Sequence, residues 1–596
     1  MDFGSDMMEE MDPQEAMERF LATQAYAGEE PRHFVNFVEE CVKESKEATT
    51  DIRRAWNTNW EAFQAKIDYT SKEEWQSQAT TNDPWQAVKQ AKSTIAKAFK
   101  NPDYFSIEGV EIGDRDYKEV VKKGMEFWLN PQHANFPVYF TDACEMGLVT
   151  GQCSEIIPLW DEEKGLVVYL VEPWKIWRDP DSEARKPWSG MYWIHEEWMD
   201  LWQMKASGLY TNLDEVKEES PDDTREQAER RKNYFWHRSK YRKSVKVREF
   251  WGTILDSKGE LLMPNCTFTV AGDQVVRMPR QNPYVRLRWP GVSFSPFTEL
   301  LRFEGKGIVE GMINIWWLLC NILNLTSDNL NWVINSVKEI DVDVMRDPGD
   351  TEIHPGKCIV RKGGTDPNMP VIVERAFGSR LNEVMSYLQY LSQQRDNSSF
   401  VNQFVTGLPG TRSNITKGEV EIKTQQSLGI FELMGDNFEL GGVDALWAIF
   451  EVVMLNWTKA HDPSIQRVFG QEYTREALIF GEMSIDERRA ILRSNADISI
   501  SGISAQLRQA DMVEKMMTIM EKLLSAPMFA QFTKPYDFLK ELSEIVGFHD
   551  PVWILGEDEV QKMSMLQGTQ FWQTLLPEQR EMLGNIIKNS GLLTAT

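Results

Sequence analysis

Two spacings of hydrophobic residues alternate along the chain and predict a protein of mixed helices and strands. Apolar residues three and four positions apart predict helices over about 33–100, 115–150 with a break at Asn130-Pro131, 196–206, 306–335, 377–397, 416–458, 508–524, 535–546 and 570–590. Alternating or apolar β-type runs between turn signals predict strands over Leu166–Val171, Met191–Ile194, 244–271 and 497–501. The mixture predicts an α+β fold.

The order of elements between 306 and 458 is the most informative part of the chain. A long helix leads into a short β segment with turn signals, and a second helix follows. A polar loop containing Gly and Pro comes next, over 398–415, and then another long helix. No repeat of about 20–50 residues is visible, which argues against a solenoid or a propeller.

The helix predicted over 306–335 carries one narrow polar stripe. Its members are Asn314, Asn321, Asn324, Asp328, Asn331 and Asn335. At about 100° per residue, these positions lie within an arc of about 100°, and most of the other positions are apolar. An ordinary amphipathic helix that faces bulk solvent is one interpretation. Such a face normally carries Lys, Glu and Arg, so the nearly uncharged stripe favours a hydrated groove or lumen.

The helix predicted over 377–397 has an apolar seam with alternating spacings of four and three. The seam consists of Phe377, Leu381, Val384, Leu388 and Leu391. This pattern predicts that the helix packs on a neighbouring element.

Charge and composition narrow the range of possible functions. The 596 residues include 65 basic and 91 acidic ones, so the net charge is −26. A protein that grips nucleic acid by neutralising phosphates needs a basic surface, and this balance argues against one. An acidic wall past which DNA slides is compatible with it. The 22 Trp are numerous for this length, which favours extensive subunit contacts or an aromatic core.

Cysteine usage and apolar run lengths address the compartment. The six Cys form no C-x-x-C pair, so neither a zinc site nor a disulfide framework is expected. The first ten residues lack the basic start and apolar run of a signal peptide. The apolar segment 308–325 is interrupted by Glu310 and three Asn, which argues against a membrane span and predicts no membrane partner.

Catalytic patterns are missing from the sequence. Gly305-Lys306-Gly307 lacks the hydroxyl and the preceding strand of a phosphate loop. The seven His are isolated, and no G-x-S-x-G motif occurs. We therefore expect no enzyme activity, no cofactor and no metal. The basic, aromatic stretch from Arg230 to Arg248 is the best candidate for nucleic-acid binding, but its acidic flank from Asp214 to Glu229 favours a structural surface strand or a subunit contact.

Several motifs resemble those of portal (head–tail connector) proteins of tailed bacteriophages, especially short-tailed ones. The similar stretches, in chain order, are Gly147–Gly151, Val171-Glu-Pro-Trp174, Arg178-Asp-Pro-Asp181, Pro283-Tyr284, Trp289-Pro290, Phe303-Glu-Gly-Lys-Gly-Ile-Val-Glu310, Pro355-Gly-Lys-Cys-Ile-Val360, Thr406-Gly-Leu-Pro-Gly410, Thr416-Lys-Gly-Glu-Val420 and Gln425-Gln426. Asn321 and Asp328 stand where the first stem helix of that family carries Asn and Asp. The similarity covers roughly residues 50–510 and rests on the order and spacing of these motifs.

The resemblance implies a portal fold with a mostly helical stem and crown, a mixed wing and a small β-containing clip. The implied divisions are a flexible acidic N-terminus (1–30), the wing (31–300), stem helix 1 (301–335), the clip (336–375), stem helix 2 (376–398), the tunnel loop (399–415), a long wing helix with a wing strand (416–507) and the crown (508–596).

The resemblance further implies a ring of about twelve subunits at one capsid vertex, assembled in the host cytoplasm, through which double-stranded DNA is packaged and ejected. The implied partners are the large subunit of the terminase, a head–tail adaptor protein, and the major capsid and scaffolding proteins. Another oligomeric virion protein of the tail or baseplate is the alternative.

Three sets of residues follow as candidate sites of this ring. The polar stripe of the first stem helix is expected to line the channel, unless it faces a neighbouring subunit. Phe400 and Arg412 of the tunnel loop are candidates for DNA contact. Lys357, Arg361 and Lys362 of the clip are candidates for docking a partner.

Overall fold

The structure is a computed structural model, and it covers most of the first 500 residues. It describes residues 30–98, 105–109, 115–219 apart from 184 and 187, 241–375 apart from 350, 353–357 and 367, 381–398, 417–458, 462–469, 483–493 and 496–500. The chain divides into two units. All of the described residues belong to the first unit, Met1–Phe99 with Phe105–Ser501. The helices predicted over 508–524, 535–546 and 570–590 lie outside the described residues.

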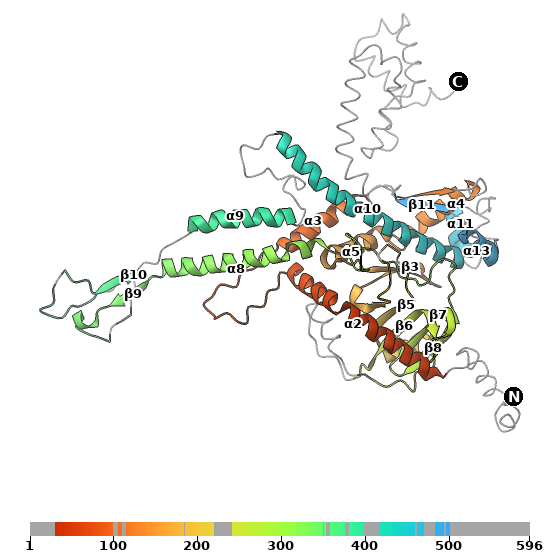
Figure 1. Ribbon diagram of the computed structural model, residues 1–596, viewed down its shortest axis with the longest axis horizontal. Helices are drawn as coiled ribbons and strands as arrows, with labels where there is room; N and C mark the ends of the chain where they lie inside the picture. Colours follow the sequence, from red (N-terminus) through yellow and green to blue (C-terminus); the bar gives the residue numbers. More distant parts are fainter. Residues whose placement is uncertain are drawn as a thin grey trace, which may run out of the picture. The chain divides into compact units, whose positions relative to one another are not determined.

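A five-stranded antiparallel sheet is the largest sheet among the described residues (Figure 1). Its strands in spatial order are β4 (Ile176–Arg178), β5 (Tyr192–Asp200), β6 (Ser244–Leu255), β7 (Leu261–Ala271) and β8 (Gln274–Gln281). The strands predicted over Met191–Ile194 and 244–271 are thereby confirmed, and with the surrounding helices they confirm an α+β composition.

One predicted helix begins too early. The pattern over 196–206 predicted a helix, but β5 continues to Asp200 and helix α6 (Leu201–Ser207) begins only there. Pairing with β6 explains the difference, because Arg248 lies opposite Glu196 and its Nε donates to Glu196 Oε2 at 2.8 Å. Tertiary pairing of this kind overrides local propensity.

Helix α2 (Pro31–Phe63) covers one face of the sheet (Figure 1). Phe34 is fully buried against Phe268 of β7, with ring centroids 5.4 Å apart in an edge-to-face arrangement. Val38 and Cys41 follow at helical spacing, so one apolar stripe of α2 supplies this half of the core.

The segment after α2 does not continue as a helix. The pattern predicted helix over about 33–100, but α2 ends at Phe63 and the next helix, α3, is Asp83–Ala98. Between them, residues 64–82 form an irregular segment, which we call the strap. Its second residue, Ala65, has a φ of 54°, which is incompatible with a continuing helix.

Helices α4 (Arg115–Leu129) and α5 (Phe136–Thr150) and the hairpin of β2 (Glu155–Asp161) and β3 (Gly165–Val171) come next. The predicted helix break at Asn130-Pro131 and the predicted strand Leu166–Val171 are confirmed. Helix α5 contacts α2, α3 and α8, so it lies in the middle of the helical layer.

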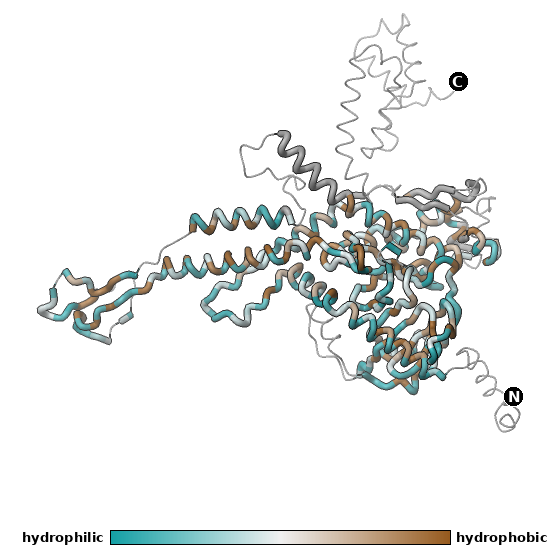
Figure 2. Tube along the Cα trace, viewed as in Figure 1, coloured by the Kyte–Doolittle hydropathy of each residue, from teal (hydrophilic) through white to brown (hydrophobic). Residues whose placement is uncertain are grey.

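The order of elements predicted after 306 is also confirmed. Helix α8 (Ile308–Ile334) leads to β9 (Val337–Ile340), the short helix η3 (Val342–Val344), β10 (Ile372–Arg375) and helix α9 (Leu381–Ser398). Strands β9 and β10 pair antiparallel, and α8 and α9 lie side by side with this pair at their far end (Figure 1). Hydrophilic positions recur along α9 (Figure 2).

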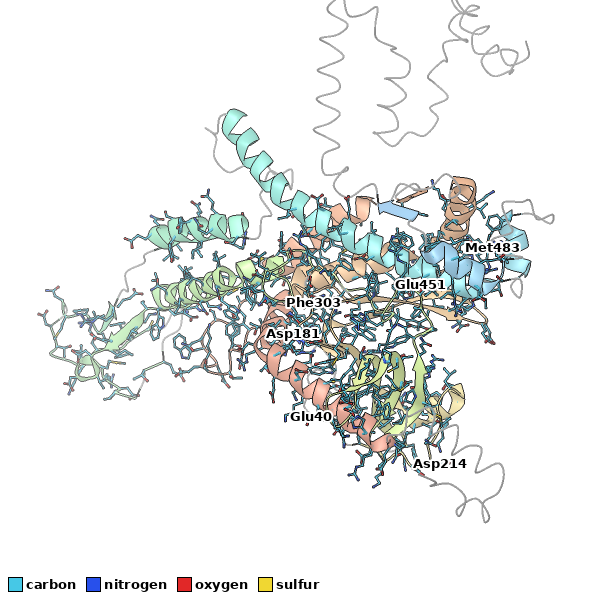
Figure 3. All side chains as sticks on the ribbon, turned by 45° about the vertical axis from the view of Figure 1, so that its right-hand side comes forward. Glu40, Asp181, Asp214, Phe303, Glu451 and Met483 are labelled. Carbon is cyan, nitrogen blue, oxygen red and sulfur yellow. The ribbon has the colours of Figure 1, made fainter. Side chains whose placement is uncertain are left out.

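Helix α10 (Lys417–Asn456) is the longest element among the described residues and confirms the predicted long helix. Its fully buried residues include Phe438, Leu446 and Ile449. Glu451 of α10 (Figure 3) accepts hydrogen bonds from the backbone N–H groups of Arg286 and Leu287, which ties the segment after the sheet to this helix.

The last described elements end in a strand that pairs with the first strand described. They are α11 (Asp462–Phe469), α13 (Ile485–Arg493) and β11 (Ala496–Ile500), and β11 pairs antiparallel with β1 (Phe105–Gly109). The predicted strand at 497–501 is confirmed within one residue.

Candidate functional site

Three glycines allow the backbone to cross where α8 begins. Gly151 ends α5 with a φ of 93°, and a Cβ at this position would lie 2.4 Å from the carbonyl oxygen of Gly305. A Cβ on Gly305 would lie 2.2 Å from Phe297 O, and one on Gly307 would lie 2.6 Å from Leu148 O. The glycines singled out in the sequence therefore serve close packing, and no side chain fits at this crossing.

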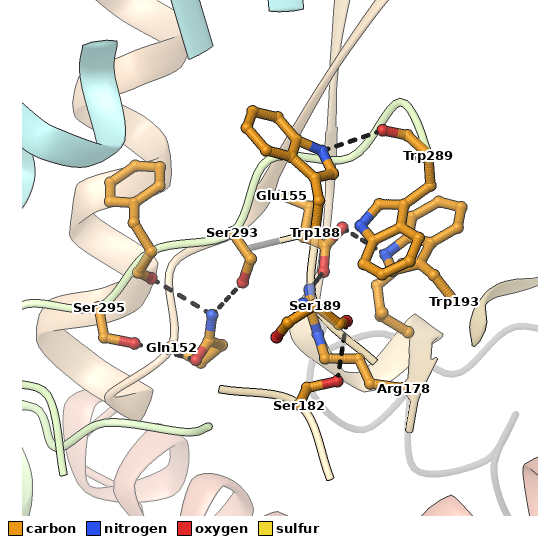
Figure 4. A network of polar contacts seen from close by, with 12 residues as sticks. Gln152, Glu155, Arg178, Ser182, Trp188, Ser189, Trp193, Trp289, Ser293 and Ser295 are labelled. Carbon is orange, nitrogen blue, oxygen red and sulfur yellow. Dashed lines mark hydrogen bonds and ion pairs between the residues drawn. The ribbon is translucent and has the colours of Figure 1, made fainter. Parts of the chain in front are cut away.

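A buried ion pair anchors the segment that precedes α8. The guanidinium of Arg178 bonds the carboxylate of Glu155, and both side chains are buried. Glu155 Oε2 also accepts the indole N–H of Trp193 at 2.8 Å, so the carboxylate is bonded from two sides (Figure 4). The guanidinium carbon of Arg178 lies 4.0 Å from the ring centroid of Phe303 (Figure 3), which fixes the approach to α8.

A neutral polar network lies beside this pair. The amide nitrogen of Gln152 donates to the Ser293 hydroxyl and to Phe294 O, and Ser295 Oγ donates to Gln152 Oε1 at 3.0 Å (Figure 4). These bonds join the end of α5 to the segment that runs toward α8.

The polar stripe of α8 is not uniformly open to water, which corrects the sequence prediction. Asn324 is fully buried and Asp328 is 8% exposed. Asn324 bonds both backbone groups of Ala79, and Asp328 Oδ1 accepts the backbone N–H of Ser77 at 2.7 Å. These two residues bind the strap of their own chain, so they do not line a channel.

The strap follows α8 over several turns. Trp316 Nε1 donates to Thr81 O at 3.0 Å, and the ring of Trp75 packs edge-to-face on Trp332 at 5.8 Å. Tyr69 accepts a hydrogen bond from the Asn324 amide at 3.1 Å. Together these contacts span α8 from Trp316 to Trp332, and they occupy the middle of the predicted stripe.

The remaining four amides of the stripe, Asn314, Asn321, Asn331 and Asn335, are exposed. They are interleaved with apolar residues that also lie at the surface. These are Trp317, Leu318, Leu323, Leu325 and Ile334, which are 37% to 73% exposed. An exposed helix surface that is this apolar is typical of an interaction surface.

The predicted seam of α9 is confirmed in part. Leu391 is buried, and Val384 and Leu388 are partly buried. A Cβ on Gly311 of α8 would lie 2.9 Å from Ser398 O, so the two helices are closest at the end near the sheet. Leu381 is 38% exposed, which corrects its assignment to the seam, and Phe377 lies outside the described residues.

The β9–β10 tip has a small core of its own, formed by Val344, Met345 and Val371. Arg361 holds its turn, because the guanidinium donates to Asp366 O at 2.9 Å and to Met369 O at 2.7 Å. Lys362 is exposed, and Lys357 lies outside the described residues. Of the three predicted docking residues, Arg361 therefore has an evident structural role.

The predicted tunnel loop, with Phe400 and Arg412, lies outside the described residues, as does most of the basic stretch from Arg230. The described end of that stretch belongs to β6, where Arg248 pairs with Glu196. Within the described ranges, no group of three or more His, Cys, Asp or Glu could hold a metal ion. The six cysteines are free thiols, and five of them are buried.

One described helix, Ile308–Ile334, is long and apolar enough to cross a membrane by composition alone. Of the most apolar 18-residue stretch of this helix, 44% is buried inside the protein. Its contacts with α5, α9 and the strap account for the buried part of its apolar surface.

A family model described as "Phage SU10 portal protein" matches residues 158–564, more than half of the chain. The match includes β2 to β11 in part or whole, with the α8–tip–α9 arrangement at its centre. A search of the curated proteins finds no match.

Proposed function

Because the chain belongs to the phage SU10 portal protein family, we propose that it forms the portal ring through which a tailed bacteriophage, of the short-tailed type, packages and ejects its DNA. Members of this family are structural components of the capsid vertex and not enzymes. The observation that carries the proposal is the family match over 158–564, which contains two adjacent helices with a β tip between them.

The elements fit the divisions of a portal subunit. The sheet, α2 to α5 and the segment up to 300 would form the wing, with 1–30 before it. Helices α8 and α9 would be the stem helices, β9 and β10 the clip, 399–415 the tunnel loop, 416–507 the long wing helix with its strand, and 508–596 the crown.

The ring itself is part of the proposal, with about twelve copies around the channel. The exposed Trp and Leu side chains of α8 support it, because apolar surface of this extent is stabilised when a second subunit covers it. The net charge of −26 per chain would keep duplex DNA from condensing on the wall.

The docking roles follow from the position of the tip. We propose that the clip, with Lys357, Arg361 and Lys362, docks the terminase large subunit during packaging and a head–tail adaptor protein afterwards. Phe400 and Arg412 would contact DNA, and the wing would contact the major capsid and scaffolding proteins during assembly in the host cytoplasm.

Electron microscopy of the purified full-length chain tests the proposal. The expected images are rings with a central opening and about twelve-fold symmetry. A compact particle without an axial opening, or a monomer at all concentrations, contradicts the proposal. Rings without a channel wide enough for duplex DNA would favour a tail or baseplate role instead.

A further inference from the structure

Helix α9 presents four different surfaces around its axis. At about 100° per residue, the partly buried seam of Val384, Leu388 and Leu391 defines the side that packs on α8. The other three sides are exposed, and each has its own composition.

The side opposite the seam is polar and uncharged. Asn382, Ser386, Gln389 and Gln393 lie there within an arc of about 60°, centred about 160° from the seam, and all four are exposed. Their spacings of four, three and four residues keep them in one row about 16 Å long, the length of roughly five base pairs.

The two flanks of this row are apolar. Leu381 and Met385, which are 38% and 49% exposed, lie about 90° to one side of it. Tyr387 and Tyr390, which are 47% and 55% exposed, lie about 100° to the other side. The two tyrosine rings stack with centroids 6.4 Å apart, so they form one continuous surface.

Charge is confined to the ends of α9. No charged residue lies between Glu383 in the first turn and Arg395 in the last. Arg395 bonds Asp83 of α3 and Asp396, both at short range, so it is not available to a ligand. A helix face in bulk solvent normally carries Lys, Glu or Arg, and the eleven uncharged positions of α9 depart from that expectation.

A helix in the wall of a ring has this arrangement of surfaces. It needs one side against an outer helix, two sides against copies of itself and one side toward the opening. We propose that the Asn382–Gln393 row of α9 forms the wall of the DNA channel in the stem, and that its Leu381/Met385 flank packs on the Tyr387/Tyr390 flank of the adjacent copy. This inference rests on the proposed portal function and names the surface that DNA passes.

The same reasoning places α8 behind α9. The strap covers the middle of the α8 stripe through Asn324 and Asp328, and the exposed amides of α8 are separated by Trp317 and Leu325. The α9 row has no such interruption. Amides and a hydroxyl exchange hydrogen bonds with water readily, and without cations they have no point of strong attachment for phosphates.

Cysteine pairs test the contact between copies. In a Cys358→Ser background, which removes the exposed native thiol, Met385→Cys is combined with Tyr387→Cys or with Tyr390→Cys. Mild oxidation of rings should give a ladder of covalent multimers with at least one pair and none with the single variants. A matched pair that replaces Met385→Cys by Asn321→Cys should give no ladder. Rings that are intact by electron microscopy but give no ladder with either pair overturn the inference, whereas absence of rings overturns the portal function itself.

An introduced cation tests the wall directly, without disturbing the flanks. Gln389→Arg would put a ring of guanidinium groups on the channel, and Asn321→Arg is the matched control on α8. Gln389→Arg rings should retain linear duplex DNA about tenfold or more better than a covalently closed circle, because only a free end can thread the ring. Asn321→Arg rings should bind both forms alike. Preference for linear DNA in Asn321→Arg, or equal binding of both forms by Gln389→Arg, overturns the inference.

Discussion

The side-chain amide of Asn324 hydrogen-bonds both backbone polar groups of Ala79, as the backbone of a neighbouring strand would. The Oδ1 of Asn324 accepts the N–H of Ala79 at 2.8 Å, and its Nδ2 donates to the carbonyl oxygen of Ala79 at 3.1 Å. One amide side chain thus satisfies both backbone polar groups of a residue 245 positions earlier. This pairing holds the strap on α8, and with Asp328 it explains why a helix this apolar carries buried polar residues.

The first prediction concerns this pairing. Asn324→Ala leaves the backbone groups of Ala79 without their partner, at a cost of about 1–3 kcal/mol. Hydrogen exchange of the strap amides Ser77 and Ala79 should become about tenfold faster or more. Asn321→Ala, which removes an exposed amide of the same helix, should leave exchange in the strap unchanged. Equal exchange in the two variants would contradict a role of Asn324 in holding the strap.

The second prediction concerns the buried pair of Arg178 and Glu155. Glu155→Gln keeps the size of the side chain but leaves the guanidinium buried without its counter-charge, and this should cost about 3–5 kcal/mol of stability. The double variant with Arg178→Met should recover part of the loss, because no unpaired charge remains. Thermal unfolding of the two proteins measures the difference.

The exposed pair of Arg54 and Asp51, 3.0 Å apart, is the control for that measurement. Its side chains are 73% and 90% exposed, so Asp51→Asn should change stability by less than about 1 kcal/mol. If Asp51→Asn lowered stability as much as Glu155→Gln does, burial of the Arg178–Glu155 pair would not be the reason for its effect on stability.

The sequence predicted the local patterns well and their tertiary partners poorly. The α8–tip–α9–α10 order and the hairpin before Val171 follow from periodicity and turn residues, which act within a few positions. The stripe of α8 was also visible, but polarity alone does not say whether water, DNA or another segment satisfies an amide. That the strap satisfies Asn324 depends on a contact across 245 positions, which no local pattern contains.

For the candidate site, too, the sequence contains the residue spacing but not the direction in which the residues face. The spacing of Asn382, Ser386, Gln389 and Gln393 is readable from the sequence, since four exposed uncharged residues recur at helical intervals. Their significance appears only once the packed side of α9 is known, because the seam fixes which direction is opposite. The seam prediction itself included Leu381, which the structure leaves exposed on a flank.

The third prediction concerns the glycine crossing before α8. Gly305→Ala places a methyl group 2.2 Å from Phe297 O and 2.6 Å from Ser295 Cβ, so backbone segments must move apart. Overpacking of this kind costs about 1–3 kcal/mol and should lower both the unfolding temperature and the yield of assembled rings. Gly363→Ala, where nothing lies within 4 Å of the added Cβ, should change neither by a measurable amount. A Gly305→Ala protein that matches the wild type would contradict the tight crossing.

The fourth prediction is a pH dependence that originates at Asp444 of α10. Burial raises the pKa of this carboxyl from its usual 3.8 to about 6, and the nearby Arg286 guanidinium opposes that rise only in part. Between pH 4 and 6 the folded protein therefore retains a proton that the unfolded chain has lost. Stability falls as the pH rises through this window, and above pH 6 the full cost of the buried charge is present, at most roughly 3 kcal/mol.

Asp444→Asn removes this cost, so the variant should be more stable than the wild type at pH 7.5 and close to it at pH 4. Unfolding temperatures across this range measure the difference between the two proteins. Asp256→Asn is the control of opposite sign, because hydrogen bonds from the backbone N–H groups of Glu260 and Lys258 lower the pKa of the exposed Asp256 carboxyl. That carboxylate stabilises the fold above pH 4, so its loss should destabilise the protein evenly between pH 5 and 8. A pH profile of Asp444→Asn that runs parallel to the wild type would mean that Asp444 is ionised at no cost in the folded protein.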